Sequence, residues 1–205
     1  IILLDNDETC GYFPRASIVY NCLKFLYPEK DTEKYIPFFI KEFFDKGGAR
    51  PGLKEFLQHL NRFKDKFTIH KLGIFTSASD HNGWVSFLAR CYEVYADIKI
   101  DIVYDRNKVG IVGSNRIIKD LRHFNYDLTQ VIIVDDKPMN VYGKVLGVPE
   151  YKYNVDLDFL IKSLPISEEN SDFIHQHLEH DKQKFPYKSI KSESESLRDN
   201  YLEKA

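Results

Sequence analysis

The chain has 205 residues, of which 43% are hydrophobic and 29% are charged, and this composition suits one globular domain with a sizeable core. The formal net charge of −2 gives no overall basic field, so nucleic acid is not expected as a partner. No apolar run approaches the roughly 20 residues that cross a bilayer and no signal peptide is visible, so a membrane is not expected as a partner either.

The first predicted element is a short strand at residues 1–4, which runs directly into a cluster of acidic residues. Four consecutive apolar residues, two of them β-branched, are typical of a strand buried on both faces in a parallel sheet. Ligands bind outside the carboxyl ends of such strands. Asp5 and Asp7 stand at that end, two residues apart, so an extended backbone directs both side chains to one side, and Thr9 follows them.

This acidic cluster has two other interpretations, an acidic turn and a calcium-binding loop. The calcium-binding loop is excluded, because an EF-hand requires glycine at its sixth position and glutamate at its twelfth, where this chain has Cys10 and Ala16. The choice between an acidic turn and a catalytic site depends on whether the partners that such chemistry requires follow later strands.

The segment after the first strand is predicted to be a helical insert, at about residues 14–48. Aromatic and aliphatic residues recur at helical spacing from Ser17 to Phe44, with a break at Tyr27 and Pro28, and Gly47 with Gly48 ends the segment. The insert is expected to pack as ordinary core. Because it leaves the carboxyl edge of the first strand, we also expect it to form a wall or cap of the site.

Strands and helices alternate through the rest of the predicted domain. Buried strands are predicted at residues 71–75, 98–104 and 131–134, with helices at 53–63, from about 80 to 88 and from Ser114. This alternation predicts an α/β fold with a Rossmann-like, doubly wound parallel sheet and right-handed crossovers. We expect residues 1–165 to form this domain and residues 166–205 to form a polar helix and a loosely docked or disordered tail.

Polar residues follow each of the predicted strands that could contribute to one site. Acids follow the first strand, Thr76 and Ser77 follow the second, Lys119 stands on the predicted helix from Ser114, and Asp135 with Asp136 follows the last strand. Alone, each has an ordinary explanation as a cap, a solvated helix residue or a turn. In this order, and at one end of one sheet, they indicate a single site.

This order resembles the four motifs of the haloacid dehalogenase superfamily of phosphotransferases. Several strings resemble the branch that contains the RNA polymerase II carboxy-terminal-domain phosphatases, also called the FCP-like or NIF domain. They are Leu-Asp-Asn-Asp-Glu-Thr at residues 4–9, Arg-Pro at 50–51 with Phe-Leu at 56–57, Phe-Thr-Ser-Ala-Ser at 75–79, and Lys-Asp-Leu at 119–121. The resemblance covers roughly residues 1–160, and the family usually has strands where this chain has its predicted helical insert.

The resemblance implies a magnesium-dependent phosphatase that acts through an aspartyl-phosphate. Asp5 would be the nucleophile, and Asp7 would act as general acid and then as general base. Thr76 and Lys119 would complete the catalytic set by holding phosphoryl oxygens and offsetting their charge. Lys119 is preferred over Lys108 for this role, because it lies within the Lys-Asp-Leu string.

The same resemblance supplies the expected binding residues. Contacts to the phosphoryl group are expected from Thr9, Thr76, Ser77 and Lys119. Ligands for Mg²⁺ are expected from Asp5, Asp7, Asp135 and Asp136, with Asp7 contributing its main-chain carbonyl and Asp136 acting directly or through water.

Two rival phosphate chemistries fail on residue order. A cysteine phosphatase requires arginine six positions after its cysteine, where Cys10 is followed by Ala16. A receiver domain places its acidic pair first and its lysine last, the reverse of the order here.

The substrate implied by the family is phosphoserine or phosphothreonine in a protein. A small phosphorylated metabolite or nucleotide is the alternative, and a non-catalytic binding module is a third hypothesis, disfavoured because both acids of the first motif are present.

The cysteines indicate the compartment. Cys10, Cys22 and Cys91 form an odd set without metal-type spacing, so we expect free thiols and a reducing compartment, the cytoplasm or the nucleus. The sequence begins at Ile1, and an upstream targeting segment is compatible with it.

Overall fold

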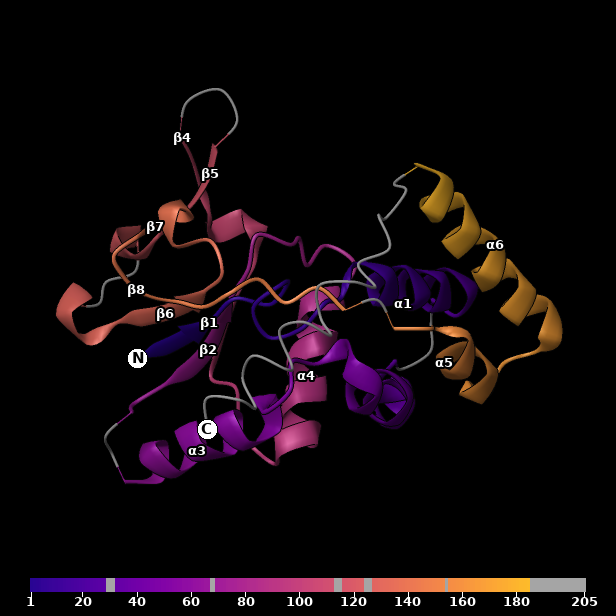
Figure 1. Cartoon of the computed structure of the whole chain (residues 1–205), viewed down its shortest axis with the longest axis horizontal. Helices are drawn as coiled ribbons and strands as arrows, with labels where there is room; N and C mark the ends of the chain where they lie inside the picture. The colour runs from indigo at the N-terminus through magenta and orange to yellow at the C-terminus, as the bar shows by residue number, and fades with distance from the viewer. Residues whose placement is uncertain (29–31, 67–68, 113–115, 124–126, 154, 185–205) are drawn as a thin grey trace, which may run out of the picture.

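A parallel five-stranded sheet forms the centre of the computed structural model, which describes residues 1–28, 32–66, 69–112, 116–123, 127–153 and 155–184 (Figure 1). The strands are β1 (Ile2–Leu4), β2 (Leu72–Phe75), β3 (Ile102–Tyr104), β6 (Ile132–Asp135) and β8 (Lys144–Gly147). Their order is β3-β2-β1-β6-β8, and every neighbouring pair is parallel. The predicted α/β fold with a parallel sheet is confirmed, with β1 at its centre.

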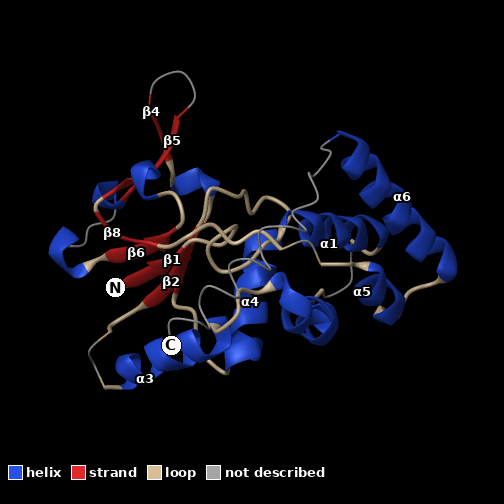
Figure 2. Ribbon diagram, in the orientation of Figure 1, coloured by secondary structure: helices blue, strands red, loops and turns tan. Residues whose placement is uncertain are grey.

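Helices pack around this sheet (Figure 2). The longer ones are α1 (Pro14–Leu26), α3 (Leu53–Asp65), α4 (Trp84–Ala96) and α6 (Glu168–Lys184), and the shorter α-helices are α2 (Ile36–Phe39) and α5 (Asp158–Ser163). Single turns of 3₁₀-helix are η1 (Glu33–Tyr35), η3 (Arg106–Lys108), η4 (Leu121–His123), η5 (Leu128–Gln130) and η6 (Pro138–Asn140). None of the described helices combines the length and the apolar character that crossing a bilayer requires.

The two faces of the central sheet contribute to different cores. Leu4 and Ile74 belong to a large core shared with the helices, whereas Leu3, Phe75 and Ile133 belong to a smaller one. Successive side chains of a strand point to opposite faces, so adjacent residues of β1 are buried in different cores. This double burial explains why the strand reads as an uninterrupted apolar run in the sequence.

A small second sheet corrects the expectation of a helix from Ser114, a residue outside those described. β4 (Gly110–Val112) and β5 (Arg116–Asp120) form an antiparallel hairpin, and β5 also pairs in parallel with β7 (Val141–Tyr142). Lys119 therefore lies on a strand and not on a helix. Ile117 and Ile118 are β-branched and suit a strand, a preference that the helical spacing of the nearby apolar residues obscured.

The insert after β1 is helical, as predicted, and many of its aromatic residues are core, although Phe25 is 74% exposed. It comprises α1, η1, α2 and a π-helix, η2 (Ile40–Gly48), in which Gly47 has a φ of 103°. Phe13, Phe39, Phe43 and Phe44 are each at most 2% exposed. Phe13, Phe39 and Phe44 pack with rings of α4, and Phe43 packs with Phe13 and Phe44. The insert is thus part of the main hydrophobic core.

The polar helix predicted within residues 166–205 is α6, which lies along the outer side of α1 (Figure 1). Ile174 is fully buried and Leu178 is 2% exposed, and the ring of Phe173 stacks on that of Phe25. These contacts fix the predicted polar helix to α1. Residues 185–205 lie outside the described part of the chain.

Candidate active site at the carboxyl edge of the sheet

The loop of residues 5–11 leaves the carboxyl end of β1 and folds around the main chain of Asn6. The Asn6 carbonyl accepts hydrogen bonds from the N–H groups of residues 9–11, at 3.2, 2.8 and 3.3 Å. Glu8 has a φ of 66°, a left-handed conformation that residues with a Cβ seldom adopt. At the start of the loop, Asp5 N–H donates to the carbonyl of Val134 at 2.9 Å. The loop is thereby fixed to β6, the neighbour of β1.

A cavity of about 160 Å³ opens at this edge of the sheet. Its lining side chains come from the ends of β1, β2 and β6, from β5 and from η6, and are those of Asp5, Asp7, Ser77, Ile117, Lys119, Asp135, Lys137 and Asn140. Ile117 and Lys119 are two positions apart in β5 and therefore share a face. The expectation that the helical insert walls the site is not met for its described part, because none of the described residues of 14–48 lines the cavity.

Lys119 lies between two of the acids that the sequence singled out. Its Nζ is 2.6 Å from Oδ1 of Asp5 and 2.7 Å from Oδ2 of Asp135. All three residues are buried, with exposed fractions of 5%, 8% and 2% for Lys119, Asp5 and Asp135. Lys108, the other lysine considered, is exposed in η3 and does not line the cavity. The geometry thus places the lysine of the Lys-Asp-Leu string at the site.

Burial changes the acidity of the two leading carboxyl groups. It raises the pKa of Asp5 from 3.8 to about 7, against the opposing effect of the Lys119 ammonium. It raises the pKa of Asp7 to about 6, and the negative charge of Glu8 acts in the same direction. A carboxyl group with this pKa can both give and take a proton near neutral pH.

Asp5, Asp135 and Asp136 form a group that could hold a divalent cation. One carboxylate oxygen of each lies within 4.8 Å of the other two. Oδ2 of Asp136 is buried and has no hydrogen-bond partner in the described structure, although Lys137 Nζ lies 3.4 Å away. The three carboxylates outnumber the two ammonium groups near them, those of Lys119 and Lys137. These hard oxygen donors, one of them unbonded, fit Mg²⁺.

A second group of carboxylates has its charge largely offset by lysines. Glu8, Asp136 and Glu150 also bring oxygens within 4.8 Å of one another. Glu8, however, forms ion pairs with Lys137 and Lys152, and Lys152 Nζ lies 2.7 Å from Oε2 of Glu150. The group around Asp5 is therefore the better cation site.

Of the hydroxyl groups expected to bind phosphate, not all face the cavity. Ser77 lines the cavity, whereas Thr9 and Thr76 are buried beside it, with exposed fractions of 4% and 1%. Thr76 Oγ1 accepts a hydrogen bond from the N–H of Ala78 at 3.2 Å. Thr9 Oγ1 donates to Oδ1 of Asp136 at 2.8 Å. Because this proton is already engaged, the Thr9 hydroxyl has none left to donate to a phosphoryl oxygen.

Sequence reasoning missed three of the lining residues. Ile117 escaped notice because β5 was expected to be a helix, and its place two residues before Lys119 would have marked it on a strand. Lys137 directly follows the acidic pair, a position at the same sheet edge that could have signalled it. Asn140 lies in η6, and no pattern in the sequence points to it.

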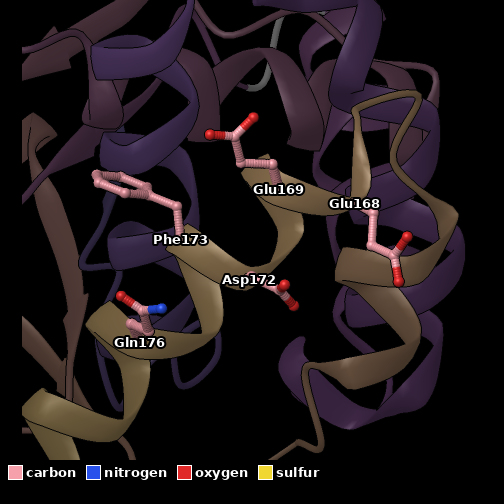
Figure 3. A pocket seen from close by; sticks show the side chains of 5 residues that line it. All are labelled: Glu168, Glu169, Asp172, Phe173 and Gln176. Carbon is pink, nitrogen blue, oxygen red and sulfur yellow. The ribbon is translucent and has the colours of Figure 1, made fainter.

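A separate hollow of about 490 Å³ lies on α6, at the outer edge of the molecule. Figure 3 shows its lining side chains, which all project from this one helix and are those of Glu168, Glu169, Asp172, Phe173 and Gln176. It contains none of the residues that the sequence singled out for chemistry. The cavity at the carboxyl edge of the sheet is therefore the candidate active site.

Among solved structures, this chain is similar to the fission yeast RNA polymerase II CTD phosphatase Fcp1 bound to beryllium fluoride. The two share 15% sequence identity with a TM-score of 0.44, over 99% of this chain and 55% of the other. The present chain thus spans just over half the length of that structure. No curated protein matches the chain.

Comparison with protein families gives a match that spans most of the chain. The model of the NLI interacting factor-like phosphatases matches residues 1–176, which include every lining residue of the cavity. The match confirms the resemblance drawn from the sequence motifs, and phosphatases are the class of protein that the family's description names. The chain belongs to the NLI interacting factor-like phosphatase family.

Proposed function

We propose that this chain hydrolyses phosphate monoesters through a phosphorylated Asp5, and that its substrates are phosphorylated serine or threonine side chains of proteins. The arrangement of Lys119 carries the chemical part of the proposal. Its ammonium contacts Asp5 and Asp135, and all three line one cavity with Asp7. A phosphoryl group bound there would meet a carboxylate, a cation and a proton donor together.

The reaction proceeds in two displacements. Asp5 forms a bond to phosphorus while the bond from phosphorus to the substrate oxygen breaks, and Asp7 gives its proton to that leaving oxygen. Asp7, now a carboxylate, takes a proton from a water molecule whose oxygen attacks the same phosphorus. The bond to Asp5 then breaks and inorganic phosphate leaves. The raised pKa of Asp7, about 6 because of burial, suits a group that must serve as both acid and base.

The remaining residues reduce the electrostatic cost of bringing a carboxylate to a dianion. Lys119 offsets charge on Asp5 and on the phosphoryl oxygens, and Ser77 offers a hydroxyl at the cavity wall. Asp5, Asp135 and Asp136 would hold Mg²⁺. When bound, this ion supplies further positive charge to the phosphoryl oxygens.

The size of the cavity favours a protein substrate over a metabolite. About 160 Å³ is well below the roughly 300–1,000 Å³ of sites that enclose a drug-sized ligand. The helical insert does not close over the cavity, since none of its described residues lines it. The phosphoryl group and the atoms next to it fill such a site, and the rest of the substrate lies on the surface outside.

A comparison of substrates tests the proposal. Release of phosphate is measured from phosphoserine and phosphothreonine peptides based on the RNA polymerase II carboxy-terminal domain, and from a panel of metabolite and nucleotide phosphates, each with Mg²⁺ and with chelator. We expect the highest kcat/KM on a peptide, no turnover in chelator and no turnover by Asp5→Asn. A higher efficiency on a metabolite would replace the substrate class, and inactivity of the folded protein on all esters would contradict the enzymatic proposal.

A further inference from the structure

Thr9 and Asp136 are joined by two hydrogen bonds although they come from opposite ends of the phosphatase domain. Thr9 Oγ1 donates to Oδ1 of Asp136 at 2.8 Å and accepts from the N–H of Asp136 at 2.9 Å. One hydroxyl thus holds both the main chain and the side chain of the same acid. Such a pair of contacts fixes the side-chain torsions of Asp136 as well as its position.

The consequence for Asp136 is that its two carboxylate oxygens are no longer equivalent. Oδ1 is engaged by Thr9, whereas Oδ2 is buried and, among the described residues, has only the ammonium of Lys137 near it, with Nζ 3.4 Å away and no hydrogen bond formed. A buried carboxylate oxygen that accepts no hydrogen bond costs free energy, and a long contact to one ammonium offsets that cost only in part. Since Asp136 belongs to the group with Asp5 and Asp135, a divalent cation there would satisfy it.

Thr9 is itself held from the other side by Arg50. Arg50 Nε donates to the carbonyl of Thr9 at 2.6 Å, and its Nη2 donates to the carbonyls of Glu8 at 2.9 Å and Pro149 at 2.5 Å. The N–H of Arg50 also donates to the carbonyl of Cys10 at 2.8 Å. The forked guanidinium therefore ties the loop of residues 5–11 to the segment that follows β8.

We propose that Thr9 is a positioning residue for the divalent cation, holding Asp136 so that it can act as a ligand, and that Arg50 holds Thr9 in place. This inference rests on the proposed function, because it assigns the acidic group to a cation used in catalysis. It departs from the role expected from the family resemblance, in which Thr9 contacts the phosphoryl group.

The two roles for Thr9 predict different losses when its hydroxyl is removed. A phosphate contact would raise KM for substrate and weaken inhibition by inorganic phosphate, with metal affinity unchanged. A positioning role would weaken metal binding, with KM unchanged at saturating metal. Groups that orient metal ligands typically contribute about 10- to 100-fold in metal affinity, so the effect is measurable.

The test uses the whole chain and Mn²⁺, a paramagnetic ion that takes the same kind of oxygen ligands as Mg²⁺. Free Mn²⁺ is counted by electron paramagnetic resonance during titration of the wild type, Thr9→Val and Thr9→Ser. We expect Thr9→Val to weaken Mn²⁺ binding about tenfold or more, and Thr9→Ser to stay within about twofold of the wild type because it restores the hydroxyl. Thr76→Val is the matched control, since its hydroxyl contacts main chain and not an acid, and should not change Mn²⁺ binding.

Arg50→Lys is a second variant, which keeps the positive charge but loses the forked hydrogen bonds of the guanidinium group. It should weaken Mn²⁺ binding in the same direction, by about three- to fivefold, because it acts on Asp136 only through Thr9. If Thr9→Val does not fold, Arg50→Lys decides the matter alone. Unchanged Mn²⁺ binding in the folded variants, or a wild type that binds no Mn²⁺, overturns the inference. Since these measurements need no substrate, they stand even if no ester is hydrolysed and the proposed function fails.

Discussion

The ammonium of Lys119 lies 2.6 Å from Oδ1 of Asp5 where both side chains are almost shielded from solvent. Removing both charges from water costs several kcal/mol each, which their attraction offsets only in part. Folding stability therefore does not account for this buried ion pair. A catalytic role accounts for it, because a site shielded from water strengthens every electrostatic interaction with a phosphoryl group that enters it.

Replacement of this lysine should affect both stability and rate. Lys119→Ala leaves Asp5 and Asp135 without their shared cation, so we expect a loss of about 3–5 kcal/mol in the free energy of unfolding and no measurable turnover. Lys108→Ala, on the exposed η3, should change the stability by less than about 0.5 kcal/mol and leave the rate near wild type. Urea unfolding and peptide dephosphorylation measure the two quantities, and the reverse ranking would place the lysine of the site elsewhere.

Stability should fall with rising pH when metal is absent. An unfolded chain loses the Asp5 proton near the ordinary value of 3.8, whereas burial raises the pKa to about 7 in the folded protein. Between these values the folded state binds more protons, so the free energy of unfolding decreases as the pH rises. The stability that the Asp5 proton contributes is complete below about pH 3.8 and is lost as the pH rises past about 7.

Urea unfolding in chelator at about pH 5 and about pH 8 checks this dependence. The loss of stability between the two should be smaller in Asp5→Asn, which has no proton to release, and smaller in the wild type once Mg²⁺ is added. Equal losses in the mutant and the wild type would show that Asp5 does not titrate in this window.

The proton transfers assigned to Asp7 can be separated by the choice of substrate. An aryl phosphate has a leaving group that needs no proton. The Asp7→Asn variant should therefore still transfer the phosphoryl group of this ester to Asp5. The second displacement still needs a base. We therefore expect a burst of about one equivalent of phenol followed by slow turnover, and no burst from a phosphoserine peptide. Rapid-quench kinetics measures the burst, and steady turnover of the aryl ester at the wild-type rate would remove Asp7 from the mechanism.

The sequence was most informative where apolar strands position the chemistry. Asp5 and Asp135 could be placed because each follows a buried strand of a parallel sheet, and such ends meet at one edge. Lys119 lines the cavity although it stands on a strand and not on the expected helix, because its motif is independent of that helix. Edge strand β8 was missed, since half-exposed residues such as Leu146 leave no continuous apolar pattern.

The contact between Thr9 and Asp136 could not have been predicted in the same way. It depends on the left-handed backbone of Glu8 and on the Arg50 fork, which together determine the path of the loop. Neither property has a pattern in a single sequence. The role expected from the motif, a phosphate contact, followed only from the position of Thr9 along the chain.

The wall of the site that faces the substrate should be β5 and not the helical insert. Ile117 lines the cavity with Lys119, and its apolar side chain offers no hydrogen bond to phosphoryl oxygens, so it suits the group attached to the phosphate. In the insert, Lys34 lies over the ring of Tyr35, with Nζ 4.7 Å from its centroid, and Lys41 pairs with Glu42 at 3.5 Å. These insert side chains are engaged locally, away from the cavity lining.

We therefore expect Ile117→Ala to lower kcat/KM for a phosphoserine peptide by a factor on the order of ten, while a small alkyl phosphate loses less than about twofold. Lys34→Ala and Lys41→Ala serve as controls and should leave the ratio of the two efficiencies unchanged, because the cavity is intact in both. A ratio altered by the lysine variants but not by Ile117→Ala would return specificity to the insert. Because the alkyl ester reports on the acids and Lys119 alone, a parallel loss on both substrates would instead indicate that Ile117→Ala displaces Lys119 through their shared strand.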